Sequence, residues 1–377
     1  MDELSANKGS PVLTEIPRHA QSSAAPTRGL ALPRTRFPAV NIALFLVTML
    51  TTTMAGAYAA GATLSMDQPL ASLLNLASGL SFSIPLMLIL FSHEMGHYLV
   101  AMRHGVDASP PYFIPAPYPS IFFIGTFGAF IRIRSRPPSR RVIFDIGAAG
   151  PWAGVIVAVA AVIIGLGRST IGPLGPSAGG FELGNSIIFY WLSRWILRVD
   201  PNSVAIVLHP IALAGWLGLF VTALNLLPVG QLDGGHTIYA LFGGRTHRLI
   251  SRVFVLGGAI TVGGSIVLGL GFWGGWLLWA ALLIMLGLGH PATTDSITPL
   301  DARRRIQAWM TIALFVVTFS PVPLKYTPPA QPENEEKAVE VIFHESSMGC
   351  CSREWLSTKV GGDVPAATTK RRSMPDR

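Results

Sequence analysis

Charged residues are scarce in this chain of 377 residues. They make up 13% of the sequence, whereas half of all residues are apolar and the mean hydropathy is +0.48. Soluble domains carry about 25% charged residues, so this composition argues against an ordinary soluble protein. The apolar residues come in long blocks and lack short amphipathic periods, which predicts an integral membrane protein.

Cysteine is almost absent. The chain has two, Cys350 and Cys351, which are adjacent in a polar segment, so a disulfide framework or a cysteine metal site is not expected. The net charge of +8 would suit a nucleic acid or an anionic lipid surface. The arginines lie in short runs between apolar blocks, as the positive-inside rule expects, so we predict a bilayer and no nucleic-acid partner.

The apolar blocks define three regions. Residues 1–37, rich in Ser, Pro, Ala and Arg, indicate a disordered arm, and 322–377 a flexible polar tail. The region between them, 38–321, is the expected membrane domain. Its fold class is predicted to be α, a polytopic bundle of about six to seven spans. The blocks lie at 38–60, 79–102, 142–167, 204–228, 252–270, 272–290 and 306–321.

Two stretches do not suit simple spans. Residues 110–134 begin with five prolines, which exclude a helix, and end in alternating Ile and Arg, which favours a strand. We therefore expect a re-entrant loop or β-hairpin between the second and third spans. Residues 184–199 mix Trp and Arg, which suits an interfacial helix.

The distribution of Lys and Arg predicts an orientation. Five precede the first block, none lie in 61–78, and six lie in 103–141. This alternation favours a cytoplasmic N-terminus and puts the C-terminal ends of the second and fourth blocks on the same side.

The second block contains His93-Glu94-Met95-Gly96-His97. Positions four apart share one face of a helix, so both imidazoles can bind one zinc ion while Glu94 reaches a water on the metal. A carboxylate inside an apolar span costs several kcal/mol unless it is compensated, and a metal compensates it. The structural alternative is a histidine pair that only faces the membrane interface.

A catalytic zinc usually has a third protein ligand. The best candidate is Asp233, in Leu232-Asp233-Gly234-Gly235-His236 after the fourth block, because the charge pattern puts that end level with the histidines. The alternative is that Asp233 caps the next helix and Gly234 and Gly235 form the turn.

These motifs resemble the site-2 protease family of intramembrane zinc metalloproteases, in its branch without a PDZ domain, found in bacteria and plastids. The resemblance also uses Gly125-Thr126-Phe127-Gly128-Ala129 and the segment from Asp145 to Gly154, and it covers residues 80–245 most strongly. It implies one zinc per chain with ligands His93, His97 and Asp233, and Glu94 as the base.

The resemblance further implies that Asn225 helps to hold substrate or the oxyanion, although helix–helix hydrogen bonding is an equal alternative. Gly125, Thr126, Phe127 and Gly128 would offer a strand edge to an extended substrate. The spacing of Gly147, Gly150 and Gly154 indicates close helix packing. His236 receives no role.

The expected partner is a membrane protein with a transmembrane segment, held in a lipid bilayer. A bacterial cell membrane is the preferred location, with the active site toward the cytoplasm, and a plastid membrane is the alternative. Two other functions compete: an ion- or proton-coupled transporter, and an inactive homologue that acts as a scaffold. The substrate, its cleavage site and the oligomeric state are not evident from the sequence.

Overall fold

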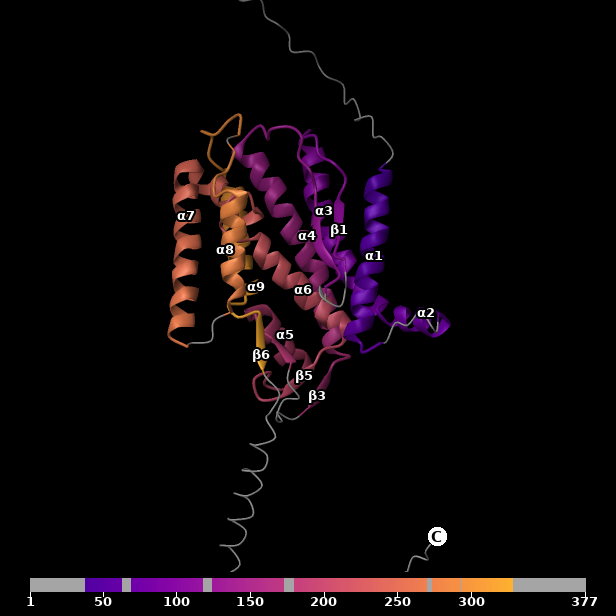
Figure 1. Cartoon of the computed structure of the whole chain (residues 1–377). Helices are drawn as coiled ribbons and strands as arrows, with labels where there is room; N and C mark the ends of the chain where they lie inside the picture. Colours follow the sequence, from indigo (N-terminus) through magenta and orange to yellow (C-terminus); the bar gives the residue numbers. More distant parts are fainter. Residues whose placement is uncertain are drawn as a thin grey trace, which may run out of the picture. The chain divides into compact units, whose positions relative to one another are not determined.

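The computed structural model of the protein describes residues 38–62, 69–117, 124–172, 180–269, 273–291 and 293–327. The chain divides into two compact units, Met1–Pro38 and Ala39–Arg377, and the fold below belongs to the second unit (Figure 1). The arm expected at 1–37 and the segment from 328 onward lie outside the described residues.

In the part of the chain that the structure describes, four helices are long and apolar enough to cross a membrane. They are α1 (Ala39–Ala59), α3 (Leu80–Arg103), α4 (Arg140–Leu166) and α7 (Asp233–Val267). About 20 residues suffice to cross the hydrocarbon core, because a helix rises 1.5 Å per residue. The mostly helical membrane architecture is therefore confirmed, and the first three predicted blocks match α1, α3 and α4 closely.

The other helices are shorter: α2 (Pro69–Ser78), α5 (Ile187–Leu197), α6 (Pro210–Asn225), α8 (Gly275–Leu286) and α9 (Ala302–Thr318). The fourth block shrinks to the 16 residues of α6, because Pro210 occupies its first turn. The fifth block lies in the second of two helical segments that make up α7 and meet at a kink at Gly243, with φ 81°. A count of six to seven spans stays a prediction.

The proline-rich segment forms two strands. β1 (Tyr112–Pro115) pairs antiparallel with β2 (Thr126–Phe130), with Phe113 opposite Ala129. This pairing is what the hairpin alternative predicts between the second and third spans, whereas a re-entrant course stays a prediction. The Ile–Arg alternation follows β2, where Ile133 forms a bridge to Ala108.

Two further strand pairs lie at the lower end of the helices in Figure 1. β3 (Thr170–Gly172) pairs with β5 (Ala205–Val207), and β4 (Gly180–Leu183) pairs with β6 (Leu324–Thr327). The described structure therefore continues to Thr327, past the boundary expected at 321. The helix expected at 184–199 is present as α5.

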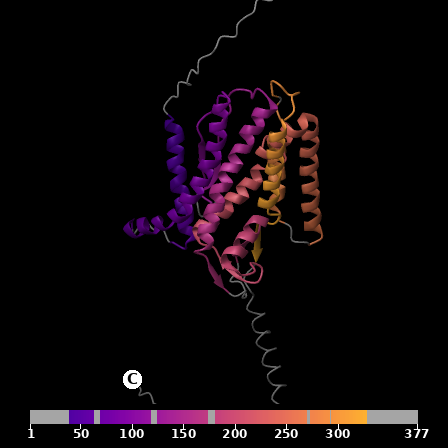
Figure 2. The ribbon, with the colours of Figure 1, turned by 180° about the vertical axis from the view of Figure 1, so that it is seen from behind.

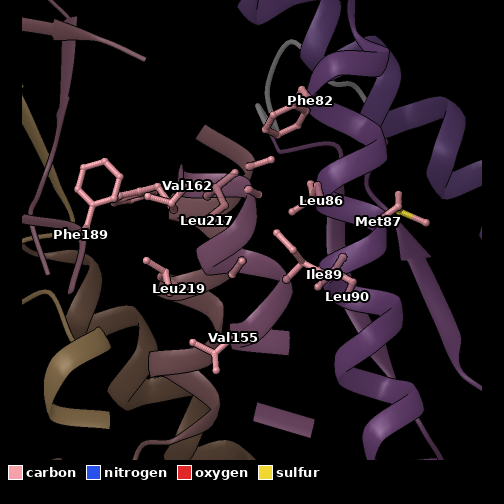
Figure 3. Close-up of a cluster of buried hydrophobic side chains, with 14 of the residues drawn as sticks. Phe82, Leu86, Met87, Ile89, Leu90, Val155, Val162, Phe189, Leu217 and Leu219 are labelled. Carbon is pink, nitrogen blue, oxygen red and sulfur yellow. The ribbon is translucent and has the colours of Figure 1, made fainter. Parts of the chain in front are cut away.

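The core that carries the site is built by α3, α4 and α6. Phe82, Leu86 and Ile89 of α3 face Val162 and Leu217 of the neighbouring helices (Figure 3). Glycine allows the close approach: a Cβ at Gly165 would lie 2.1 Å from the Ala212 nitrogen on α6. α1 and α7 lie at opposite edges of these helices (Figures 1 and 2).

Candidate metal centre

Two histidines of α3 and the first residue of α7 bring three ligand atoms together. His93 Nε2 and His97 Nε2 are 3.1 Å apart, and Asp233 Oδ2 lies 3.3 Å from each of them. The histidines are four residues apart and therefore project from one helix face. Their exposures are 5% and 7%. Among the described residues, this is the group of at least three His, Cys, Asp or Glu side chains that could hold a metal ion.

The spacing of these atoms fits zinc. A tetrahedral zinc ion, with bonds of about 2.0–2.1 Å to nitrogen and oxygen, holds neighbouring ligand atoms about 3.3 Å apart. The separations of 3.1, 3.3 and 3.3 Å match that edge length. Two imidazoles and one carboxylate also leave a fourth position open, which is the pattern of catalytic and not of structural zinc sites.

A backbone carbonyl of α4 orients His97. The His97 Nδ1 atom lies 2.8 Å from the carbonyl oxygen of Ile146, so Nδ1–H donates to it. This bond leaves the lone pair of Nε2 directed at the other ligand atoms, which is the tautomer that a metal requires. Ile146 was not identified from the sequence, because any residue type can supply a carbonyl.

Glycines on α4 provide the space for both imidazoles. A Cβ at Gly150 would lie 2.0 Å from His97 Nε2, and one at Gly154 would lie 3.1 Å from His93 Cβ. The predicted close packing is present, but the nearest atoms at these glycines belong to histidine side chains. Gly147 makes space for His236 in the same way, because a Cβ at Gly147 would lie 2.8 Å from the His236 Cβ.

The turn before α7 delivers Asp233. Gly230 adopts φ 57°, and Gly234 approaches the Leu226 carbonyl so closely that a Cβ would lie 2.0 Å from its oxygen. α7 has Leu232 at its N-cap position and no side-chain cap. The capping alternative for Asp233 is therefore wrong, because its carboxylate lies at the two histidines instead.

Arg140 holds the other end of this first segment of α7. Its Nη2 donates to the carbonyl oxygen of Ala240 at 2.5 Å, just before the interruption at Gly243. The guanidinium is buried and supplies a donor where the interrupted helix leaves carbonyls without partners. The sequence signalled only an arginine in a basic loop, so this contact was missed.

Asn225, the last residue of α6, also reaches the centre. Its Nδ2 lies 3.2 Å from His93 Nε2. The side chain therefore points at the ligand atoms, where it is placed to contact a bound group. The same contact joins α6 to α3, so it also fits the alternative of a hydrogen bond between helices.

Glu94 is buried beside β2. Its exposure is 7%, and its carboxylate lies against the backbone of Ile131, just beyond the strand. Gly125 packs on α1, where Thr51 Oγ1 donates to its carbonyl oxygen at 2.7 Å. Thr126 Oγ1 donates to the Ile114 carbonyl oxygen at 2.8 Å and stabilises the hairpin. The chain just beyond β2 therefore lies next to the buried carboxylate, and a substrate-binding role for residues 125–128 stays a prediction.

Phe127 and Gly128 differ from their neighbours on the strand. The Phe127 side chain is 57% exposed. Gly128 has φ 100°, and a Cβ there would meet no atom within 4 Å. The strand therefore has open space along the part that contains these two residues.

His236, left without a role by the sequence, forms a pair with His290. His236 Nδ1 and His290 Nε2 are 2.7 Å apart, and His290 Nδ1 donates to the Pro291 carbonyl oxygen at 2.7 Å. His290 therefore accepts the His236 proton. His290 was missed because it is 54 residues away and no local motif marks it.

A model of peptidase family M50 matches residues 81–270, half of the chain, and this range contains the three ligand residues, Glu94 and Asn225. The chain belongs to peptidase family M50, the family of the site-2 proteases.

Similar proteins come from plants. The probable zinc metalloprotease EGY1, chloroplastic, of Arabidopsis thaliana is 32% identical over 245 residues, which cover 62% of this chain and 41% of that protein. Its namesake in Oryza sativa subsp. japonica is 34% identical over 197 residues, covering 49% and 33%. The probable zinc metalloprotease EGY2, chloroplastic, of Arabidopsis thaliana is 30% identical over 172 residues, covering 45% and 30%. The chain spans less than half the length of these relatives.

The expected location is corrected by these relatives. Their names place them in chloroplasts, which contradicts a bacterial cell membrane. The cytoplasmic side expected for the active site assumed that bacterial membrane and is corrected with it. The error has a physical cause. Hydropathy and basic loops indicate a membrane and an orientation, but they do not distinguish a bacterial membrane from a plastid membrane.

Proposed function

We propose that this protein is an intramembrane zinc metalloprotease that hydrolyses peptide bonds in or near transmembrane segments of membrane proteins. The observation that carries the proposal is the meeting of His93, His97 and Asp233 at zinc spacing beside the buried Glu94. Family membership supports it. The three ligand residues would hold the ion, and Glu94 would act as the base.

Zinc supplies a Lewis acid that polarises the scissile carbonyl and makes an attacking water more acidic. Glu94 takes the proton of that water and passes it to the leaving amine, since its carboxylate is the buried base on the helix that carries both histidines. Asn225 donates from its amide to the oxyanion, which its position 3.2 Å from His93 Nε2 supports.

The proposed activity is tested with the purified protein and, as substrate, a tagged protein that has a single transmembrane span. We expect chelator-sensitive cleavage that falls at least about 10²-fold in Glu94→Gln, with the zinc content unchanged. Asp107→Asn is the matched control, since this exposed carboxylate only pairs with Arg134 at 3.7 Å. Equal cleavage by Glu94→Gln and the wild type would refute the proposed role of Glu94.

The substrate strand is proposed to add to the outer edge of β2. The Ser109 N–H donates to the Arg132 carbonyl oxygen, so Arg132 turns its carbonyl toward the segment that leads into β1. Alternate residues of an antiparallel strand face opposite edges. Ala129 and Ile131 therefore turn their backbone groups toward the other edge, where Glu94 lies against Ile131.

Proline at Ala129 tests this edge, because it removes the N–H while the bonds to β1 remain. We expect Ala129→Pro to lose cleavage and retain zinc, and Ala129→Ser, which keeps the N–H, to cleave normally. Wild-type cleavage by a folded Ala129→Pro protein would rule out strand addition at this edge.

A plastid membrane is the proposed location, as the names of the plant relatives suggest. Six to seven crossings would follow if α6, α9 and α8 cross alongside the four long helices, within the protein and at a reduced length. Single-cysteine labelling after replacement of Cys350 and Cys351 would locate each connecting segment, and a loop labelled on the wrong side would eliminate that crossing.

The competing functions receive less support. A transporter built from paired halves would have two matching discontinuous helices. Among the described helices, α7 alone has non-helical backbone inside it. An inactive scaffold predicts a lost ligand or base, yet all four residues are present and three converge.

A further inference from the structure

A cavity between α3, α4 and α9 lies beside the metal centre and differs from it in chemistry. It has a volume of about 470 Å³ and is lined by α3, α4 and α9. Ala148 and Ala149 of α4 line it, whereas Gly147 and Gly150 on the adjacent face of α4 contact His236 and His97. The volume is in the range of small-ligand sites, about 300–1,000 Å³.

The cavity has a charged end and an apolar end. Arg103, His104 and Asp145 lie at the charged end, where α3 finishes and α4 begins. Trp152 and Met310 line the apolar end. Trp152 is seven residues beyond Asp145 on α4, which is about 10 Å deeper along the helix.

The charged end lies where two candidate membrane spans end, which is the level expected of a membrane surface. α3 and α4 are both long enough to span a membrane. The C-terminal end of α3 and the N-terminal end of α4 meet at this end of the cavity. The N-terminal end of α9 lies on the same, upper side in Figure 1. Lipid headgroups occupy this level, and the methylene chains begin below it.

The charges at this end favour an anion. The Asp145 carboxylate is already neutralised: Arg304 Nε and Nη2 each donate to one of its oxygens at 2.8 Å, and His104 Nε2 lies 3.0 Å from Oδ2. Arg103 is exposed at the cavity and has no hydrogen bond or ion pair within the part of the chain that the structure describes. An arginine in this state suits a phosphate-type oxyanion, which it binds with two parallel N–H bonds.

We propose that this cavity binds an anionic glycerolipid, whose headgroup oxyanion pairs with Arg103 and whose first chain methylenes pack on Trp152 and Met310. A soluble phosphate would satisfy the arginine and leave the apolar end unfilled, so a lipid uses the whole cavity.

A lipid bound here would brace the ligand-bearing turns. Val100 lines the cavity one turn after His97, and Asp145 at its rim precedes Ile146, whose carbonyl orients His97. Binding should therefore stabilise the folded protein whether or not the centre hydrolyses peptides.

The test uses the full-length protein in phosphatidylcholine nanodiscs with and without phosphatidylglycerol. Lipid retained by the protein is measured by native mass spectrometry, and thermal unfolding is followed in parallel. We expect phosphatidylglycerol to be retained and to raise the unfolding temperature. Arg103→Gln should retain it about tenfold less, since a charge-assisted bond is lost. Met310→Trp, which narrows the apolar end, should also weaken retention.

Two controls make the result specific. Arg305→Gln removes a nearby exposed arginine outside the cavity and should retain lipid like the wild type. Glu94→Gln should also retain it, which separates this proposal from the proposed peptidase activity. Wild-type retention by Arg103→Gln, or equal loss in Arg305→Gln, would overturn the proposal. Equal stabilisation by free glycerol 3-phosphate would show a soluble anion site and overturn the lipid assignment.

Discussion

Replacing Gly150 with alanine should remove the metal while leaving the helix intact. The added Cβ would lie 2.0 Å from His97 Nε2, 2.4 Å from Cδ2 and 2.5 Å from Cε1. Ordinary contacts begin near 3.4 Å, so the imidazole must move by about 1.4 Å. Metal–ligand distances tolerate only about 0.2 Å, so His97 can no longer bind.

The His97 ring cannot move away from the added Cβ without losing a hydrogen bond. Rotation away from α4 breaks the 2.8 Å bond from Nδ1 to the Ile146 carbonyl, and displacement of α4 breaks the same bond. Alanine otherwise suits a helix better than glycine by about 0.5–1 kcal/mol, so the helix itself is not weakened. We expect less than about a tenth of the wild-type zinc content and at least about 10²-fold less cleavage.

Zinc is measured by elemental analysis of the monodisperse protein, and helix content by circular dichroism. Gly154→Ala is the matched control on the same helix. Its Cβ would lie 3.1 Å from His93 Cβ and 3.2 Å from Nδ1, which a shift of a few tenths of an ångström relieves. It should keep most of its zinc. A folded Gly150→Ala protein with one zinc per chain would refute the placement of His97.

Four further results are expected. Asp233→Asn should weaken zinc binding at least about 100-fold in a competition titration, since the anionic ligand is lost; unchanged affinity would exclude it as a ligand. Asn225→Ala should keep its zinc and lose about 10²–10³-fold in kcat, whereas a structural role predicts lower stability and normal kcat. Gly128→Val should destabilise the hairpin by about 1–3 kcal/mol, because φ 100° suits glycine alone. A wild-type stability in chemical denaturation would contradict this. Burial and the neighbouring His236 lower the pKa of His290 to about 3, below the ordinary value of about 6.5. The unfolded chain then binds more protons, so metal-free stability should be complete above pH 6.5 and decline as the pH falls toward 3. His290→Gln should flatten that thermal-unfolding profile, and an unchanged slope would contradict the assignment.

Much of the centre was predictable because its chemistry is local. The spacing of His93 and His97 puts two imidazoles on one helix face whatever the rest of the chain does. The basic loops predicted that the ends of the second and fourth blocks lie on one side, which made Asp233 a plausible third ligand. The structure brings its carboxylate to the histidines.

The helix lengths and the supporting contacts were less predictable. Apolar runs indicated a fourth span at 204–228, but Pro210 starts α6 late and the helix ends at Asn225. The same property concealed the break in α7, since an apolar composition continues through Gly243. Hydropathy measures how apolar a segment is and carries little information about where its backbone turns.

The sequence by itself determined a membrane-embedded helical protein with two histidines and a carboxylate on one turn of helix, because composition and a spacing of four residues act locally. The tertiary structure decided the third ligand, the space that Gly150 leaves for His97, and the cavity at Arg103 and Trp152. These features join segments far apart in the chain, and only the packing of α3, α4, α7 and α9 brings them within reach of one another.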